Sequence, residues 1–358
     1  MLYHLLYGLH AKFSAFNVFR YITFRTVLAI LSALLISFFL TPFTIRKFNE
    51  WKIKSDKRED VPDRHSEKTG TPTMGGFVIL ISTIIPALLW SDLSNFYIWV
   101  VVFALLSFGS IGFMDDIKKL RNEQGKGVPG RTKLIFQIFF TVVIGALLYR
   151  KNGFITELTV PFFKDVVPNL GVFYVIFCVF IVVGASNGVN LTDGLDGLAI
   201  GPVLTVCSTF MLFAYLAGNI KFAQYLQIFY VRGAGELTIL CGAMLGAGIG
   251  FLWYNTYPAE LFMGDTGSLS LGASLAVIAV IIKQEILLVI VGGVFVIETL
   301  SVIIQVSSFK WRGKRVFRMA PIHHHFELKG WNEGKIVVRF WIISFILALL
   351  ALSTLKLR

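Results

Sequence analysis

Long apolar stretches alternate with short polar stretches along the whole chain. A helix needs about 20 apolar residues to cross a bilayer, and ten stretches approach or exceed that length. The predicted transmembrane helices cover 23–45, 75–91, 97–114, 132–149, 171–187, 198–217, 237–254, 266–282, 286–309 and 337–355. The second is short and contains Pro86, and the ninth contains Gly292, Gly293 and Glu298, which predicts a break or bend there.

Five aspartates lie at the edges of these apolar stretches. Asp115 and Asp116 close one stretch, Asp193 and Asp196 precede another, and Asp265 begins a third. A carboxylate at a membrane boundary is costly unless it faces water, a cation or a partner. Together, these residues predict a pocket for Mg²⁺ and a phosphorylated substrate at the membrane surface.

Composition agrees with a membrane protein. Hydrophobic residues make up 56% of the 358 residues, charged residues only 15%, and the mean hydropathy is +0.73. These values exclude an ordinary soluble domain and predict an all-α polytopic membrane protein. The three cysteines lie in apolar stretches without any metal-ligand spacing, which indicates inert core thiols.

The basic residues predict the orientation. The segments 46–74, 115–133 and 306–335 hold 21 of the 33 Lys and Arg residues, and all three lie on one side of the predicted membrane. The positive-inside rule makes that side cytoplasmic. Ten spans then place both termini on the periplasmic side, and the five aspartates on the cytoplasmic side.

The chain reads as one integral membrane domain, 1–358, without a cleavable signal peptide. Residues 1–21 mix aromatic, basic and leucine side chains, which is typical of a helix lying on the membrane surface. No internal repeat is evident. This weakens the alternative of a secondary transporter with acidic ion sites, because many transporters show such a repeat and place their sites near the midplane.

The aspartates also have structural interpretations. Asn190, Asp193 and Asp196 share one helical face at a spacing of three residues, but each can also serve as a cap in a polar loop. Asp115 and Asp116 diverge by about 100° on a helix and cannot both face one point. Asp265 precedes a span and can act either as an N-cap or as part of a metal and phosphate site.

Two cytoplasmic loops add basic and histidine side chains. Lys68 precedes the TPTMGG turn, and Lys119 and Lys133 flank another loop; each either contacts substrate or binds anionic lipid heads. The loop FRMAPIHHHFELKGW contains three consecutive histidines, 323–325. Adjacent histidines diverge, so a zinc site from this run alone is not expected, whereas ring N–H groups can bind phosphate or sugar oxygens.

Six stretches together resemble the polyprenyl-phosphate N-acetylhexosamine-1-phosphate transferases. They are TPTMGG (71–76), GFMDDIKK (112–119), NLTDGLDGLA (190–199), FLWYNTYPAELFMGDTGSL (251–269), GGVFVIETLSVIIQV (292–306) and APIHHHFELKGW (320–331). The last stretch favours the branch that transfers phospho-N-acetylmuramoyl-pentapeptide over the GlcNAc-1-phosphate branch. A CDP-alcohol phosphotransferase, suggested by DGLDGLA, is disfavoured because Ile200 stands where that family expects Arg.

The resemblance implies a Mg²⁺-dependent enzyme of the bacterial inner membrane. It would join UDP-N-acetylmuramoyl-pentapeptide to undecaprenyl phosphate, giving lipid I and UMP, in contact with membrane lipids, as a homodimer and without nucleic acid. The resemblance implies that Asp265 coordinates Mg²⁺, that Asp116 supports the metal or the lipid phosphate, and that Asp115 removes a proton from the lipid phosphate.

The resemblance also implies that the loop 190–196 lines the nucleotide pocket and that Phe262 stacks on uracil. Basic and histidine side chains would surround the phosphates and the sugar. The expected substrate-binding residues are Lys68, Thr73, Lys119, Lys133, Asn190, Asp193, Asp196, Asn255, Phe262, Gln305, His323, His324 and His325. Glu298 is expected to be a structural partner inside the bundle.

Overall fold

The computed structural model describes residues 1–51, 70–122, 127–163 and 166–356. Every regular element in these ranges is a helix, and the backbone makes one isolated bridge besides, between Glu157 and Asn169. The α-helices are α1 (Leu2–Gly8), α2 (Ile22–Glu50), α3 (Gly76–Trp90), α4 (Phe96–Arg121), α5 (Gly130–Tyr149), α6 (Tyr174–Thr192), α7 (Ile200–Ala217), α8 (Ile220–Leu226), α9 (Leu237–Asn255), α10 (Gly264–Ile281), α11 (Glu285–Val291), α12 (Gly293–Arg312), α13 (Ile322–Glu327) and α14 (Glu333–Ser353). Short 3₁₀ segments cover Leu9–Ala11, Ser14–Arg20, Gly171–Phe173, Ala234–Glu236 and Thr354–Lys356.

Nine helices in the described part of the chain are long and apolar enough to cross a membrane. The protein is therefore a multi-pass membrane protein, and the predicted all-α class is confirmed. The second predicted span is α3, which has only 15 residues. The count of ten spans stays a prediction for this reason.

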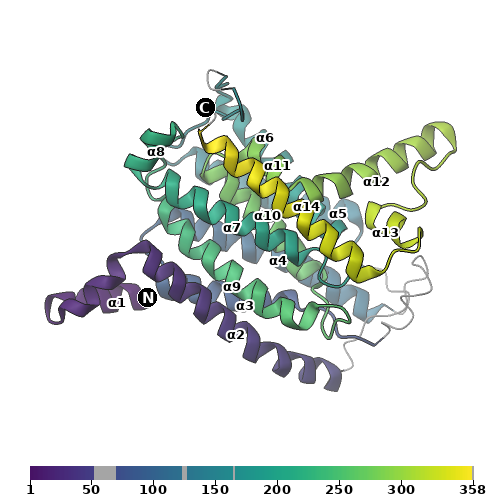
Figure 1. The fold of residues 1–358 in the computed structure, drawn as a ribbon, viewed down its shortest axis with the longest axis horizontal. Coiled ribbons are helices and arrows are strands. Elements are labelled where there is room, and N and C mark those ends of the chain that lie inside the picture. Colours follow the sequence, from purple (N-terminus) through teal and green to yellow (C-terminus); the bar gives the residue numbers. More distant parts are fainter. Residues whose placement is uncertain (52–69, 123–126, 164–165, 357–358) are drawn as a thin grey trace.

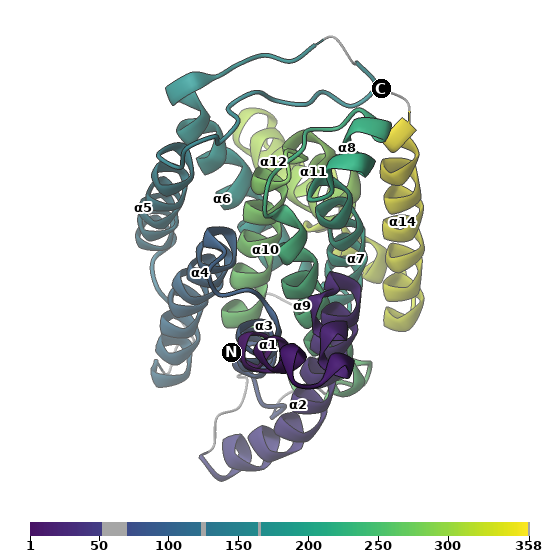
Figure 2. The ribbon, with the colours of Figure 1, turned by 90° about the vertical axis from the view of Figure 1, so that its left-hand side faces the viewer.

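Helix α10 lies at the centre of the bundle. It packs against α3, α4, α6 and α7 (Figure 2), and 94% of its apolar stretch is buried. Its sequence, GDTGSLSLGASLAVIAVI, is rich in small residues, which let neighbouring backbones approach closely within a membrane. At Gly272, for example, a Cβ atom would lie 2.6 Å from the carbonyl oxygen of Ala185 in α6.

The ninth predicted span is broken, as its glycines predicted. The short helix α11 ends at Val291, and Gly292 separates it from α12. Helix α12 then leaves the bundle at a steep angle (Figure 1). All buried residues of α12 lie between Gly293 and Ser301. The break thus turns the second half of α12 away from the core.

Both chain termini lie at the same end of the bundle, on the left in Figure 1. The Met1 ammonium donates to the carbonyl oxygen of Leu88 at 2.7 Å, near the end of α3, and Arg25 donates twice to Glu236, at 2.9 and 2.7 Å. This arrangement agrees with an even number of crossings. The side of the membrane on which the termini lie, and the surface position of residues 1–21, stay predictions.

Candidate active site

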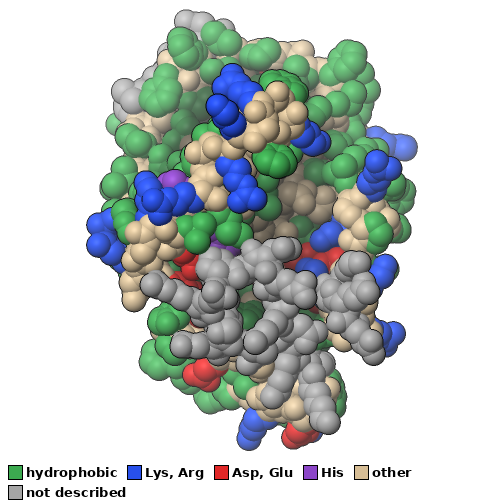
Figure 3. Space-filling model, turned by 90° about the vertical axis from the view of Figure 1, so that its right-hand side faces the viewer, with side chains coloured by type: hydrophobic (Ala, Val, Ile, Leu, Met, Phe, Trp, Pro, Cys, Tyr) green, Lys and Arg blue, Asp and Glu red, His purple; other side chains and the backbone are tan. Residues whose placement is uncertain are grey.

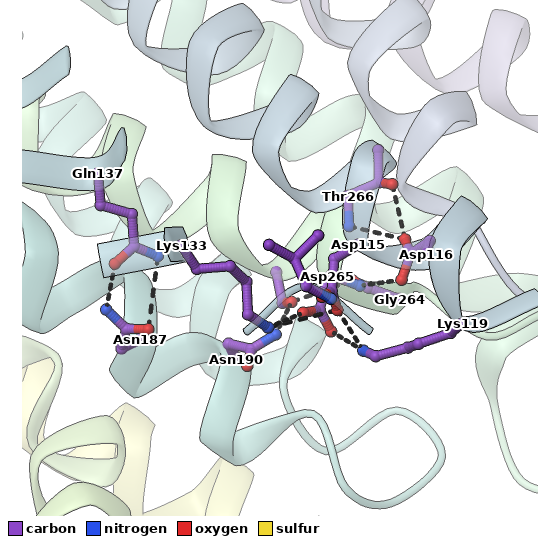
Figure 4. Close-up of polar contacts among 12 residues, drawn as sticks. Asp115, Asp116, Lys119, Lys133, Gln137, Asn187, Asn190, Gly264, Asp265 and Thr266 are labelled. Carbon is purple, nitrogen blue, oxygen red and sulfur yellow. Dashed lines mark hydrogen bonds and ion pairs between the residues drawn. The ribbon is translucent and has the colours of Figure 1, made fainter. Parts of the chain in front are cut away.

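Three carboxylates from two distant segments of the sequence converge at the other end of the bundle. Asp115 and Asp116 lie near the end of α4, and Asp265 lies in the first turn of α10 (Figure 4). Each offers one oxygen atom, and these atoms lie within 4.8 Å of one another. The helices can approach because α4 carries Gly112, whose Cβ would lie 2.2 Å from the carbonyl oxygen of Asp265.

Asp116 caps the start of α10. Its Oδ1 accepts a hydrogen bond from the Asp265 N–H at 3.1 Å, and its Oδ2 accepts from the Thr266 N–H at 3.0 Å and the Thr266 hydroxyl at 2.7 Å. Gly264 adopts a φ of 72°, and a side chain there would collide with the same carboxylate. Asp116 therefore satisfies N–H groups that a helix start leaves without partners.

Asp115 and Asp265 share two lysines. Lys119 Nζ lies 2.6 Å from Asp115 Oδ2 and 3.0 Å from Asp265 Oδ1. Lys133 Nζ lies 3.3 Å from Asp115 Oδ2 and 3.0 Å from Asp265 Oδ2. Asp115 is fully buried and also accepts a hydrogen bond from the Val128 N–H at 2.7 Å.

The cluster fits a hard divalent cation. Its three carboxylates exceed the two ammonium groups by one negative charge, and its ligands are oxygen atoms alone. Mg²⁺ prefers a few carboxylates together with phosphate oxygens and water, whereas zinc favours nitrogen and sulfur ligands. The geometry therefore supports a metal-binding acidic cluster beside two cations that can bind phosphate.

The TPTMGG stretch lies against the segment that leads into α10. The Phe262 N–H donates to the Pro72 carbonyl at 2.9 Å, and the Gly75 and Gly76 N–H groups donate to the carbonyls of Phe262 and Met263, both at 2.8 Å. Thr73 and Phe262, both predicted substrate contacts, are half-buried in this junction.

The loop after α6 is held from several sides. Asn190 donates to the Ser268 hydroxyl of α10 at 2.9 Å, and Asp196 Oδ2 accepts from the Ala259 N–H at 3.0 Å. Asn255 accepts from the Gly197 N–H at 3.1 Å and donates to the Leu261 carbonyl at 2.9 Å. Asn255 is buried, so in this structure it ties two loops together. Asp193 is half-buried at the end of α6.

The three consecutive histidines have three different partners. His323 Nδ1 lies 3.2 Å from Glu298 Oε1, and His324 Nδ1 lies 2.6 Å from Glu327 Oε2. His325 Nδ1 accepts from the Arg318 N–H at 3.1 Å. Burial, followed by the positive charges of Lys329 and Arg318, holds the pKa of His325 below its usual value, so the neutral ring is favoured.

Gln305 and Lys68 were also predicted to bind substrate. Gln305 accepts hydrogen bonds from the Val316 and Phe317 N–H groups at 3.0 and 2.9 Å and donates to the Phe317 carbonyl at 2.9 Å, so it fastens the returning chain to α12. Lys68 lies outside the described residues. The substrate-binding roles of all the predicted residues stay predictions.

One polar pair near the lysines was not predicted. Asn187 donates to Gln137 Oε1 at 2.8 Å, and Gln137 is almost fully buried between α5 and α6 (Figure 4). The sequence could have indicated this pair through helical spacing, because Gln137 follows Lys133 by four residues and Asn187 precedes Asn190 by three. Each pair lies along one helical face.

The end of the bundle that carries this cluster is rich in cations. Figure 3 views it directly, and among the residues drawn in colour Lys and Arg side chains stand out around the face. A surface of this kind suits anionic ligands such as nucleotides and lipid phosphates.

Comparison with known proteins identifies the family. The sequence model of glycosyl transferase family 4 matches residues 98–283, which include both acidic segments of the cluster. The chain is 59% identical over 358 residues to a phospho-N-acetylmuramoyl-pentapeptide-transferase of Pelobacter propionicus and 58% identical over 359 residues to one of Syntrophus aciditrophicus. A third, from Geobacter sp. (strain M21), is 57% identical over 358 residues, and all three alignments cover 100% of both chains.

This chain belongs to the phospho-N-acetylmuramoyl-pentapeptide-transferase family. The resemblance that the motifs indicated is thereby confirmed, including the choice of branch. Membership makes the protein a phosphoglycosyl transferase and favours this interpretation over the transporter and the CDP-alcohol phosphotransferase.

Proposed function

We propose that the protein transfers phospho-N-acetylmuramoyl-pentapeptide from its UDP derivative to undecaprenyl phosphate. The products are lipid I and UMP, in the first membrane step of peptidoglycan synthesis, at the cytoplasmic face of the bacterial inner membrane. The observation that carries the proposal is the cluster of Asp115 and Asp265 with Lys119 and Lys133, at one end of a chain that resembles transferases of this name along its whole length.

The reaction brings two anions together. An oxygen of the lipid phosphate attacks the β-phosphorus of the UDP-sugar, a new P–O bond forms, and the bond to UMP breaks. Lys119 and Lys133 turn from the carboxylates toward the phosphates, where their charges offset the repulsion between the two substrates. Asp265 and Asp116 would hold Mg²⁺, which when bound supplies further neutralisation of the pyrophosphate and of leaving UMP.

The remaining residues bind and position the substrates. Asp115 accepts the proton of the lipid phosphate. Its carboxylate is fully buried against Lys119, so this role requires the lysine to move first. The loop from Asp193 to Asp196 binds the nucleotide, Phe262 stacks on uracil, and the sugar end lies toward the remaining predicted contacts.

An assay of UMP release tests the proposal. The purified protein with Mg²⁺ and undecaprenyl phosphate should release UMP from UDP-N-acetylmuramoyl-pentapeptide and not from UDP-GlcNAc. Release from UDP-GlcNAc alone would contradict the choice of branch. Exchange of UMP in the absence of the lipid would favour a covalent intermediate over the direct displacement proposed here.

The oligomeric state is a separate part of the proposal. Members of this family are expected to work as homodimers, and we extend that expectation to this chain. Mass measurement of the detergent-solubilised protein tests it, and a single protomer mass under conditions of full activity would contradict it.

A further inference from the structure

Glu298 is a carboxylic acid buried within an apolar helix. It lies in the first half of α12, its side chain is completely inaccessible, and its Oε1 lies 3.2 Å from His323 Nδ1 of α13. Its Oε2 is buried without a hydrogen-bond partner among the described residues. A carboxyl group in such surroundings costs free energy, and proteins that retain one usually use it.

His323 links this acid to the loop after α6. The contact with Glu298 engages Nδ1 and leaves Nε2 on the opposite edge of the ring, where it is buried and has no hydrogen-bond partner among the described residues. That edge presses on Gly194, because a Cβ atom there would lie 2.3 Å from Nε2. The ring is thus held between the carboxyl group of α12 and the backbone of the loop.

The rest of the loop is fastened by other elements. The Asp196 N–H donates to Glu333 Oε1 at 2.9 Å, the Gly197 N–H donates to Asn255 at 3.1 Å, and the Trp341 ring N–H donates to the Gly197 carbonyl at 3.1 Å. These contacts hold the second half of the loop. In the first half, Gly194 packs against the imidazole of His323.

We propose that Glu298 is a positioning residue for nucleotide binding. By fixing the His323 ring in one orientation, it sets the Asp193–Gly197 backbone in the conformation that receives the nucleotide of the UDP-sugar. Neither side chain needs to touch substrate, since both are completely buried. The inference rests on the proposed function and replaces direct substrate contact as the role of His323.

Two substitutions at one position test the hydrogen bond. In Glu298→Gln the amide oxygen still accepts from Nδ1–H, so KM for the UDP-sugar and the Kd of UMP should stay within about threefold of wild type. In Glu298→Leu no acceptor remains, and both constants should rise about tenfold while kcat stays within about threefold, as for other lost orienting partners. UMP affinity is measured by calorimetry on the detergent-solubilised protein.

Glu285 offers a matched control. It is also completely buried, but it pairs with Lys283 at 2.6 Å at the opposite end of the bundle. Glu285→Gln should lower the melting temperature without altering KM or the UMP Kd. The proposal is overturned if folded Glu298→Leu, like Glu285→Gln, keeps its KM and UMP Kd, or if it loses only kcat. It is also overturned if Glu298→Gln is as impaired as Glu298→Leu.

A second variant covers the case in which Glu298→Leu does not fold. Gly194→Ala places a methyl carbon 2.3 Å from His323 Nε2 and must shift the ring or the loop. The UMP Kd should rise about tenfold, and an unchanged Kd overturns the proposal. Wild-type protein that neither binds UMP nor releases it would instead contradict the proposed function, so the two failures are distinguishable.

Discussion

At the scale of single residues, two adjacent aspartates have different surroundings. Asp116 accepts three hydrogen bonds from the start of α10, whereas Asp115 faces Lys119 and Lys133 together with Asp265. Within the same cluster, one carboxylate therefore joins two helices and the other pairs with the two lysines. The sequence motif DD contains both roles, and only the three-dimensional structure separates them.

This separation predicts different defects for two conservative substitutions. Asp116→Asn and Asp265→Asn should each lower UMP release at least about a hundredfold, since each removes a carboxylate that is proposed to hold Mg²⁺. Only Asp116→Asn should also lower the melting temperature by several degrees, because an amide cannot accept all three hydrogen bonds and an unsatisfied donor costs about 1–3 kcal/mol. Thermal unfolding in detergent measures this difference.

Asp92→Asn, at the far end of the bundle, serves as the control. Asp92 Oδ1 accepts hydrogen bonds from the Ser94 N–H at 2.9 Å and the Ser94 hydroxyl at 2.7 Å, and an amide keeps that oxygen, so the substitution should alter neither quantity. Equal melting temperatures for the two cluster variants would contradict the capping role of Asp116. Retained turnover in Asp265→Asn would remove that residue from the proposed metal site.

At the scale of elements, the site depends on a close crossing of α3 and α10. A Cβ atom on Gly76 would lie 2.0 Å from the backbone nitrogen of Gly267. Backbone lies on both sides of this contact, so nothing flexible can move aside. The crossing seats the TPTMGG stretch next to the segment that carries Phe262 and Asp265.

We therefore expect Gly76→Ala to be severely destabilising. The new methyl group forces two helices apart, and overpacking of this kind typically costs about 1–3 kcal/mol or more. Gly184→Ala is the matched control, because Gly184 is an exposed glycine of α6 where an added Cβ atom would meet no other atom within 4 Å. That substitution should stabilise by up to about 1 kcal/mol through helix propensity.

The yield of folded protein and its melting temperature in detergent measure both effects. A Gly76→Ala variant as stable as wild type would show that the crossing tolerates a larger separation. It would also weaken the argument that this contact positions the segment before α10.

The sequence predicted the class of elements and most of the acidic cluster, but not the partners. Apolar length predicts helices, and Gly292 signals the break between α11 and α12. The pairing of Asp116 with Thr266 joins residues 150 positions apart, and nothing local in the sequence specifies such a contact. Gln305 was likewise predicted to contact substrate, but it accepts from the Val316 and Phe317 N–H groups of the segment that follows α12.

At the scale of the whole molecule, ion-paired side chains form separate groups at the two ends of the bundle. The cluster at one end stays nearly balanced because two ammonium groups lie against three carboxylates. At the other end, Arg25 pairs with Glu236, and the buried Lys283 pairs with Glu285. Each set of charges has its own counterions, so the fold does not depend on a metal for neutrality.

Removal of divalent cations should therefore stop turnover without unfolding the protein. With chelator, UMP release should fall to background and return when Mg²⁺ is added. The melting temperature should fall by only a few degrees, since a cation at tenfold excess over its Kd contributes about 1.4 kcal/mol. Loss of cooperative unfolding in chelator would contradict the role given to Lys119 and Lys133.

The orientation of the bundle can be tested with cysteines because the native thiols give no background. Cys178, Cys207 and Cys241 are all buried. Ile220→Cys in α8 lies at the end of the molecule that carries the termini, and Leu328→Cys after α13 lies at the end that carries the cluster; both native side chains are exposed. A nucleotide-sugar substrate is made in the cytoplasm, so the proposed function requires the second position to face inward.

A membrane-impermeant maleimide should label Ile220→Cys in intact spheroplasts and Leu328→Cys only after lysis. The reverse pattern would place the carboxylates outside the cell, where the soluble substrate cannot reach them, and would contradict the proposed reaction.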